Sequence, residues 1–312
     1  MTYYPVFDVS AWQAYRPEAL GTKEKRWLTS PAEHSLPGRM HLFKIGRAGT
    51  GENWSEKVVS EIAKGMGLPC AQYDFATSDN EKGVITPRFL ADGGTFFAGN
   101  FLLSTITDGY DGEKRFQQIK YTIDRVVSVL KSLPLLHRYD GFDNPTNITP
   151  IEVFLGYLIL DILVGNTDRH HENWGVIANV GERDVSLRLA PTFDHASSLG
   201  RNEPDDRRRM RLSTNDRRAT VCSYAHRGKS AFYAGKSEKH TLLLRDTLGV
   251  IKYLNPKACR YWAETAVGLT ETFFEEIFLQ IDPSLIESSA IDFALAMLKC
   301  NQRTIREVGL DA

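Results

Sequence analysis

The chain has 312 residues, of which 42% are hydrophobic and 25% charged, and its formal net charge is −1. This composition is ordinary for a globular protein, and the small net charge excludes a strong overall field toward nucleic acid or membranes. The N-terminus lacks a basic region followed by an apolar run, and the most apolar run, 153–160, is too short to span a bilayer. No C-x-x-C pair is present, so we expect neither a zinc site nor a redox pair. Free thiols in a reducing cytoplasm are the expected state of Cys70, Cys222, Cys259 and Cys300.

Residues 1–91 are predicted to form a small lobe in which strands surround one helix. Alternating apolar residues between turn signals predict the strands, at 26–29, 41–45, 70–77 and 84–90. Apolar residues at helical spacing predict a helix at 53–66 with Asn53 as its N-cap. A further short strand at 101–107 is expected to connect this lobe to the next.

Lys44 lies in the middle of the strand predicted at 41–45, among large apolar neighbours. A strand lysine is usually an exposed edge residue, unless a carboxylate on a following helix can reach it. An advance of 100° per residue places Glu56 at the border of the buried face of the helix and Glu61 toward solvent. Glu56 is therefore the candidate partner of Lys44. The alternative is that Glu56 only caps the helix, and the sequence leaves both roles open.

One glycine, Gly21, opens the segment GTKEKRWL at 21–28. A phosphate-binding loop usually offers several glycines, so that backbone N–H groups can close on the anion. A single glycine is also what a turn entering a strand needs, and the sequence leaves both interpretations open.

Residues 92–312 are predicted to form a second, mostly helical lobe. Apolar residues at helical spacing predict helices at 115–133 and 150–164. The second of these helices starts with a full set of signals, namely an N-cap at Thr149, a proline at the first position and a glutamate at the third. It is apolar nearly all round, so we expect it to lie buried and to hold the loop that follows, 165–175, in a fixed place.

A hairpin and further helices follow this loop. Segments 175–180 and 185–194 are predicted to pair as strands, with Asp194 at the end of the second. The arginine-rich segment 201–218 is polar without a period, so we expect a mobile loop that is either solvated or faces a substrate. Its lack of aromatic residues argues against nucleic-acid binding. Helices are then predicted at 250–254, 257–269, 271–281 and 283–308.

The loop GNTDRHHENWG at 165–175 carries the residues of greatest chemical interest. Asp168 and Asn173 are spaced as Asp-x₄-Asn, and Asp194 follows at the end of the predicted hairpin. A phosphotransferase needs one carboxylate at the acceptor hydroxyl, and an amide and a second carboxylate that hold Mg²⁺ on the ATP phosphates. The alternative is that Asp168 and Asn173 only cap local turns.

Three histidines flank these residues. His170 and His171 have no partner at metal-ligand spacing within their own element, which argues against a metal site there. His170 is instead expected to hold the loop in shape by hydrogen bonding. His195 is expected to do the same for the neighbouring Asp194.

The motifs, taken in this order, resemble the HipA family of serine/threonine kinases, in the compact single-domain group that includes HipT and CtkA. The similarity runs from about Gly21 to Arg227, and its specific pieces are GNTDRHHEN and LAPTFDHASSLG. The resemblance implies an α+β, two-lobed protein-kinase-like fold. Its N-lobe would be small and β-rich with one helix, and its C-lobe mostly helical.

The resemblance also implies a role for each matching residue. Asp168 and His170 would be catalytic, Asn173 and Asp194 would bind the metal, and Lys44, Glu56 and Gly21 would bind ATP. Family toxins phosphorylate aminoacyl-tRNA synthetases and are neutralised by a DNA-binding antitoxin, so both kinds of partner are implied. The autophosphorylated loop serines of the family and the extra N-terminal subdomain of its full-length toxin have no clear match in these residues.

The residues and the resemblance together lead us to expect a cytoplasmic, Mg-ATP-dependent kinase that phosphorylates a serine or threonine hydroxyl of a protein. A phosphoinositide-type lipid kinase is the first alternative, because D-R-H-x-x-N followed by an Asp and a Leu-Gly also occurs there. No polybasic cluster outside 201–218 marks a membrane surface, which argues against it. A non-catalytic ATP-binding scaffold is the second alternative. Direct binding to membranes or nucleic acid is not expected.

Overall fold

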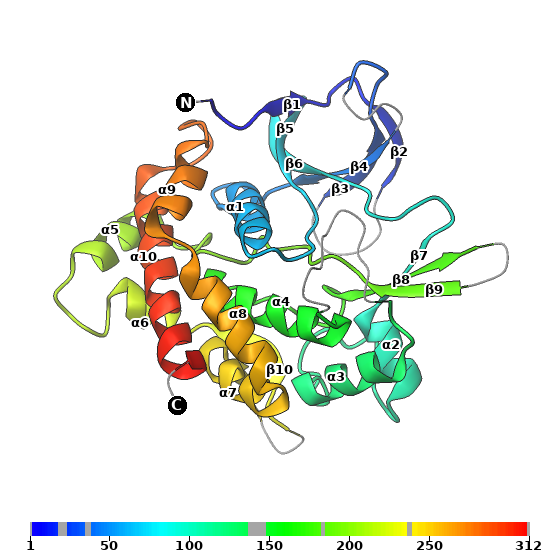
Figure 1. Cartoon of the computed structure of the whole chain (residues 1–312). Coiled ribbons are helices and arrows are strands. Elements are labelled where there is room, and N and C mark those ends of the chain that lie inside the picture. Colours follow the sequence, from blue (N-terminus) through cyan, green and yellow to red (C-terminus); the bar gives the residue numbers. More distant parts are fainter. Residues whose placement is uncertain are drawn as a thin grey trace.

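The computed structural model describes residues 2–17, 24–34, 39–136, 148–181, 185–235 and 239–310. Over these residues the fold is α+β, with a six-stranded sheet and one helix in the first lobe and mainly helices in the second (Figure 1). The sheet has the order β1-β5-β6-β4-β3-β2. Its strands are β1 (Val6–Asp8), β2 (Gln13–Pro17), β3 (Lys25–Thr29), β4 (Met40–Ile45), β5 (Asp74–Ser78) and β6 (Glu81–Pro87). The β1–β5 pair is parallel and the other pairs are antiparallel.

Helix α1 (Glu52–Gly65) lies between this sheet and the helices of the second lobe (Figure 1). Its apolar residues Val58, Val59 and Ile62 are fully buried, and they belong to the core cluster that both lobes share. The burial of α1 against both lobes places the side chains on its flank at the boundary between them.

Most strands predicted in the first lobe are confirmed, as β3, β4 and the β5–β6 hairpin. Two predicted boundaries are wrong. Helix α1 begins at Glu52 with Gly51 as its N-cap residue, so no side chain caps it and Asn53 lies within its first turn. The Asn53 amide donates to the Lys82 carbonyl at 3.1 Å. The strand expected from residue 70 starts only at Asp74, because the chain at Cys70 forms an isolated bridge to the second lobe. A lobe boundary near residue 91 stays a prediction.

The second lobe contains a three-stranded and a two-stranded sheet within its described residues, and helices form its bulk (Figure 1). Its first half comprises β7 (Thr95–Ala98), α2 (Gly99–Ile106), α3 (Ile123–Ser132), α4 (Pro150–Val164), β8 (Gly175–Val180) and β9 (Val185–Leu189). Its second half comprises α5 (Asp205–Ser213), α6 (Val221–Ala225), β10 (Lys229–Tyr233), β11 (Thr241–Leu243), α7 (Leu244–Leu254), α8 (Pro256–Gly268), α9 (Glu271–Leu279), α10 (Ser288–Ile305) and the π-helical turn Arg306–Leu310. Helices α7 to α10 confirm the helical C-terminal part.

Two elements predicted before α4 are wrong. Residues 101–107, expected as a strand, lie in α2, because the strand that pairs with β8 ends at Ala98 and the chain turns directly into a helix. Residues 115–122, expected to be helical, are irregular. Gln117 adopts a left-handed φ of 56°. Helix α3 begins only after Thr122, whose side chain caps it.

Helix α4 is the buried base of the second lobe. It begins with the predicted capping box, in which the Thr149 hydroxyl accepts from the Glu152 N–H at 3.2 Å and the Glu152 carboxylate accepts from the Thr149 N–H at 2.8 Å. All of its residues beyond Glu152 are buried. A Cβ at Gly156 would come within 2.6 Å of the Trp262 ring, so α8 packs closely on α4. The helix ends at Gly165, whose φ of 67° turns the chain into the loop of interest.

The segment 201–218 contains helix α5, so the prediction of a mobile loop is wrong. The Arg208 guanidinium is buried and donates to the Asp205 carboxylate at 2.8 Å. The same carboxylate accepts from the Ser289 hydroxyl of α10 at 2.8 Å. These contacts hold α5 against α10. Because they are polar, the apolar periodicity of the sequence did not reveal this helix.

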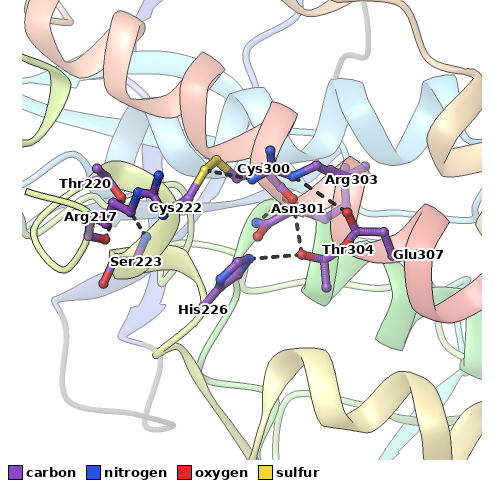
Figure 2. The surroundings of a disulfide bond; sticks show 11 residues. Arg217, Thr220, Cys222, Ser223, His226, Cys300, Asn301, Arg303, Thr304 and Glu307 are labelled. Carbon is purple, nitrogen blue, oxygen red and sulfur yellow. Dashed lines mark hydrogen bonds and ion pairs between the residues drawn. A yellow bond between two sulfur atoms is a disulfide. The ribbon is translucent and has the colours of Figure 1, made fainter. Parts of the chain in front are cut away.

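A disulfide joins Cys222 of α6 to Cys300 of α10, with the two Cα atoms 5.5 Å apart (Figure 2). The expectation of free thiols without a redox pair is therefore wrong for these two residues. Their separation of 78 positions hid the pairing, because only the fold brings α6 against α10. Cys70 and Cys259 are free. Within the described part of the chain, none of the helices combines the length and apolar character needed to cross a bilayer.

We expect loss of this disulfide to lower the free energy of unfolding by about 2–4 kcal/mol, because the bond restricts the unfolded chain. Urea unfolding of Cys222→Ala/Cys300→Ala beside the oxidised wild type measures the difference. Dithiothreitol should destabilise the wild type and leave the double variant unchanged. Equal stability of the oxidised wild type and the double variant would contradict the expectation.

Candidate active site

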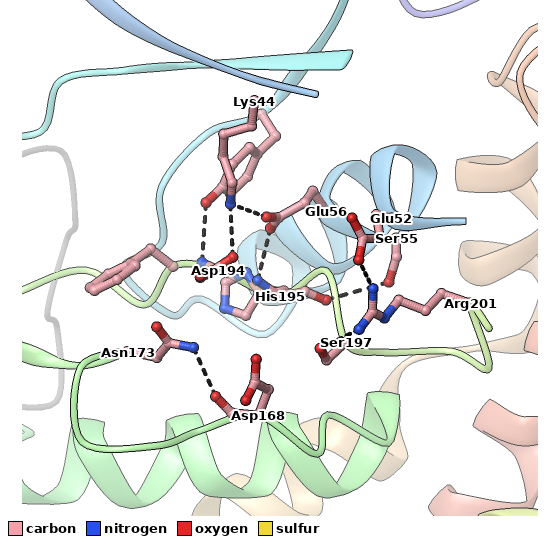
Figure 3. Close-up of polar contacts among 12 residues, drawn as sticks. Lys44, Glu52, Ser55, Glu56, Asp168, Asn173, Asp194, His195, Ser197 and Arg201 are labelled. Carbon is pink, nitrogen blue, oxygen red and sulfur yellow. Dashed lines mark hydrogen bonds and ion pairs between the residues drawn. The ribbon is translucent and has the colours of Figure 1, made fainter. Parts of the chain in front are cut away.

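Lys44 and Glu56 form a buried ion pair between β4 and α1 (Figure 3). The Lys44 ammonium also donates to the Asp194 carboxylate at 2.8 Å. Burial lowers the pKa of Lys44, but Asp194 and Glu56 outweigh this effect and hold the pKa well above its usual value. Lys44 is therefore a fixed cation, and the pairing expected with Glu56 is confirmed.

Glu56 does not cap its helix. Its second carboxylate oxygen accepts from the backbone N–H of His195 at 2.8 Å, across the boundary between the lobes. Glu56 thus ties Lys44 to the segment that carries Asp194. The alternative role of Glu56 as a helix cap is wrong, since α1 has no side-chain cap.

Asp194 lies in a loop beyond β9, which ends at Leu189, so its predicted place at the end of a strand is wrong. Its φ of 57° is in the left-handed region, which is uncommon for a residue with a Cβ and costs about 1 kcal/mol or more. The Asp194 N–H donates to the Tyr73 hydroxyl at 3.1 Å, and the Lys44 ammonium lies 5.2 Å from the centre of the Tyr73 ring. Tyr73 thereby holds the backbone that aims the Asp194 carboxylate at Lys44.

Asp168 and Asn173 face this cluster from the loop after α4 (Figure 3). The Asn173 amide donates to the Asp168 carbonyl at 2.8 Å, and the Asp168 N–H donates to the Asn166 side chain at 3.1 Å. The Asp168 carboxylate points up into the space below Asp194 and is 36% exposed. The structure therefore brings together five of the site residues predicted from the sequence.

Arg169 organises this loop from within, although the sequence reasoning missed it. Its guanidinium, 2% exposed, pairs with Asp161 of α4 at 2.8 Å and donates to the Asn173 carbonyl at 2.8 Å. It also reaches the Phe193 carbonyl at 3.4 Å, beside Asp194. The sequence does contain a signal for such a residue. Asp161 is a carboxylate inside an otherwise apolar helix, and a buried charge needs a partner of opposite charge.

His170 is buried beside Asp168, with its Nε2 atom 3.8 Å from an Asp168 carboxylate oxygen. The same Nε2 atom lies 2.6 Å from the guanidinium of Arg115, a second residue that the sequence reasoning missed. Burial, followed by the charge of Arg115, lowers the pKa of His170 to about 3. A neutral, buried imidazole whose two ring nitrogens contact the Arg115 guanidinium and the Glu172 backbone N–H fits the expected loop-shaping role.

His195 and His171 are also buried and neutral. The His195 Nε2 atom lies 2.8 Å from the Thr192 hydroxyl, which holds the segment before Asp194 as expected. Burial lowers the pKa of His195 well below its usual range and that of His171 to about 4. Both rings are therefore parts of the packed scaffold.

Because these three histidines are buried and neutral, we expect the protein to lose stability in mild acid. The unfolded chain takes up protons on them as the pH falls through 6.5, whereas folded His170 and His171 stay neutral down to about pH 4. The unfolded state then binds more protons, so stability is full above pH 6.5 and falls toward pH 4, by at most about 1.4 kcal/mol per pH unit for each histidine.

Urea unfolding at pH 7.5, 6.5 and 5.5 measures this loss. His171→Gln should reduce the slope, because its pKa is lowered in the folded state. Equal unfolding free energies at the three pH values would contradict the assignment of buried neutral histidines.

The oxygen donors of the site fit Mg²⁺. Asp194 offers a carboxylate and Asn173 an amide oxygen, which are hard ligands of the kind Mg²⁺ prefers. No group of three or more His, Cys, Asp or Glu suited to a metal ion exists within the described ranges. Magnesium often takes only one or two protein ligands and completes its shell with phosphates and water, so this donor set is sufficient. Gly21 lies outside the described residues.

The chain is similar in sequence to one family. A profile of the HipA-like C-terminal domain matches residues 18–251. No curated protein sequence matches the chain.

The fold is similar to that of a solved kinase and to that of a chain in a solved toxin–antitoxin complex. The crystal structure of a Helicobacter pylori proinflammatory kinase, CtkA, superposes with a TM-score of 0.74 at 18% identity, covering 98% of this chain and 97% of that one. The toxin–antitoxin complex of HipA, HipB and operator DNA from Shewanella oneidensis MR-1 contains a chain that superposes with a TM-score of 0.57 at 12% identity. This match covers 98% of the present chain and 67% of that one. These similarities confirm the predicted α+β, two-lobed kinase fold.

Proposed function

The chain belongs to the HipA-like C-terminal domain family, and we propose that it is a Mg-ATP-dependent kinase that phosphorylates serine or threonine hydroxyls of a protein. One observation carries the proposal. The buried Lys44 ammonium is held between Glu56 and Asp194, opposite the partly exposed carboxylate of Asp168. A fixed cation, a metal-binding oxygen pair and a solvent-accessible carboxylate on the acceptor side are the parts that phosphoryl transfer requires.

Lys44 would bind the phosphates of ATP, and Glu56 keeps its ammonium in place. Asn173 and Asp194 would hold Mg²⁺, which neutralises charge on the phosphates when bound. The raised pKa of Lys44 keeps it charged throughout the physiological pH range. The protein thus supplies preformed charges, and these need little reorganisation during the reaction.

Asp168 would orient the acceptor hydroxyl and accept its proton. Its backbone is fixed by Asn166 and Asn173, while its carboxylate keeps access to solvent. Because the nearby His170 is neutral, no imidazolium competes for this carboxylate. Positioning of the hydroxyl in line with the phosphate supplies much of the rate of such a reaction.

The proposal extends to location and partners. We place the protein in the cytoplasm, although structural disulfides such as Cys222–Cys300 are rare there. An aminoacyl-tRNA synthetase is a candidate substrate and an antitoxin protein a candidate partner. The family resemblance supports a toxin role, and the Shewanella chain is described as part of a toxin–antitoxin complex. Neither membrane nor direct nucleic-acid binding belongs to the proposal.

Nucleotide binding tests the proposal before any substrate is known. Mg-ATP should raise the melting temperature of the wild type, and Lys44→Met should abolish that rise because the phosphates lose their cation. Lys64→Met, on an exposed residue of the same helix as Glu56, should keep it. A wild type whose melting temperature does not respond to Mg-ATP would contradict the proposal.

The acceptor class needs a second assay. Labelled phosphate from ATP is offered together with a cytosolic extract and with phosphoinositide vesicles. Label on protein supports the proposal, and label on lipid alone would show a lipid kinase instead. Binding of ATP without transfer to any acceptor would favour a scaffold.

A further inference from the structure

A cavity of about 430 Å³ opens beside the loop 165–175 that carries Asp168. Its wall includes Thr167, the residue before Asp168, and Ser197, whose carbonyl accepts from the Thr167 N–H at 3.3 Å. Figure 3 shows Asp168 between Asn173 on one side and Ser197 on the other. The cavity therefore adjoins the acceptor side of the site.

The cavity is separate from the phosphate-binding side. Lys44, Asn173 and Asp194 do not line it. A group bound in the cavity would thus lie next to Asp168 without occupying the place proposed for ATP.

The lining of the cavity is cationic. Among the described residues it contains no Asp or Glu, and its basic members are Arg201, Arg211, Arg227 and Lys229. Two of these cations have structural partners: Arg201 pairs with Glu52 of α1, and Arg211 pairs with Glu203 at 2.5 Å. Arg227 and Lys229 are exposed and form no ion pair with any residue that the structure describes.

The walls of the cavity are held together covalently. Tyr224 and Ala225 come from α6, and Met297 comes from α10. The Cys222–Cys300 disulfide links these two helices (Figure 2). A cavity with fixed walls loses little conformational entropy when a ligand enters, which favours recognition.

We propose that this cavity binds an anionic side chain, a carboxylate or a phosphate, close in sequence to the acceptor residue of the protein substrate. This inference rests on the proposed function. An extended peptide advances about 3.3 Å per residue, so a side chain a few positions from a hydroxyl at Asp168 reaches a cavity that Thr167 lines. Arg227 and Lys229 would pair with the anion. The aromatic ring in the described lining, that of Tyr224, is half-buried and has the Arg211 guanidinium 5.1 Å from its centre. It offers little surface for base stacking, so an acidic peptide fits better than single-stranded RNA.

Peptide binding tests the inference without turnover. The probes are fluorescent peptide pools with a central serine and flanking glutamate, phosphoserine, glutamine or lysine, measured by anisotropy with the full chain and a non-hydrolysable Mg-ATP analogue. The glutamate or phosphoserine pools should bind the wild type best. Arg227→Gln/Lys229→Gln should weaken that binding about tenfold, the scale of a lost charge-assisted hydrogen bond. The matched variant Lys257→Gln/Arg260→Gln, on exposed residues of α8, should bind like the wild type.

Charge reversal gives a readout that a folding defect cannot mimic. Arg227→Glu/Lys229→Glu should shift the preference toward the lysine pool. Unchanged binding in Arg227→Gln/Lys229→Gln, equal binding of the glutamine and glutamate pools, or tighter binding of an RNA of matched charge would each overturn the inference. A wild type that binds anionic pools but transfers no phosphate would contradict the proposed function only, so the two failures are distinguishable.

Discussion

We expect Asp168→Asn to leave the protein folded and to lower phosphate transfer from Mg-ATP by at least about 10²-fold, the usual scale of lost acid–base help. The substitution keeps the size of the side chain but removes its charge. The loop should survive because the substitution keeps the backbone contacts at this position, in which the Asp168 carbonyl accepts from the Asn173 amide and from the backbone N–H of His170 at 2.8 Å each. The loss should therefore appear in the rate of transfer and not in stability.

The measurement is the initial rate of label transfer, with circular dichroism and melting temperature recorded on the same samples. Asp206→Asn is the matched control, because Asp206 is an exposed aspartate on α5. Asp194→Asn should lose activity to a similar extent through its proposed metal-binding role. Activity of Asp168→Asn within a few-fold of the wild type would contradict the assignment.

The second large effect concerns the buried pair of Asp161 and Arg169. Removal of one partner leaves an uncompensated charge in the core, so Asp161→Asn should lower the free energy of unfolding by about 3–5 kcal/mol. Urea unfolding measures this loss. Glu264→Gln is the control, because the Arg260–Glu264 pair on α8 lies at the surface and should contribute less than about 1 kcal/mol.

A double variant separates stability from positioning. Asp161→Leu/Arg169→Met replaces the pair with apolar side chains, which should recover most of the lost stability. Transfer should stay at least about tenfold low, because the Asn173 and Phe193 carbonyls lose the donor that fixes them. A double variant with full activity would show that Arg169 has no role in positioning the site.

Local sequence signals predicted the elements that position the site. Helix α4 was predictable to the residue because its apolar run starts with Thr149 and Glu152 in a capping box and ends before Gly165. The pairing of Lys44 with Glu56 followed from helical geometry, since a step of 100° per residue places Glu56 at the edge of the buried face. Such inferences succeed because the helical spacing of apolar residues and the capping of a helix both depend on residues that are close in sequence.

The features that the sequence predicted wrongly or did not reveal depend on contacts between segments that are distant in the chain. The left-handed turn at Asp194 is held by Tyr73 from the other lobe. Helix α5 is held by a polar contact to α10, and the disulfide joins residues 78 positions apart. The partner of Asp161 could have been sought, because a carboxylate inside an apolar helix requires one, but the sequence alone could not identify Arg169 among many cations.

The most direct test of the central claim is phosphoamino-acid determination after transfer of labelled phosphate from Mg-ATP, with wild type and Asp168→Asn side by side in a cytosolic extract. The account predicts phosphoserine or phosphothreonine on protein with the wild type and almost none with the variant. Label that is confined to lipid, or equal protein label in both samples, would contradict it.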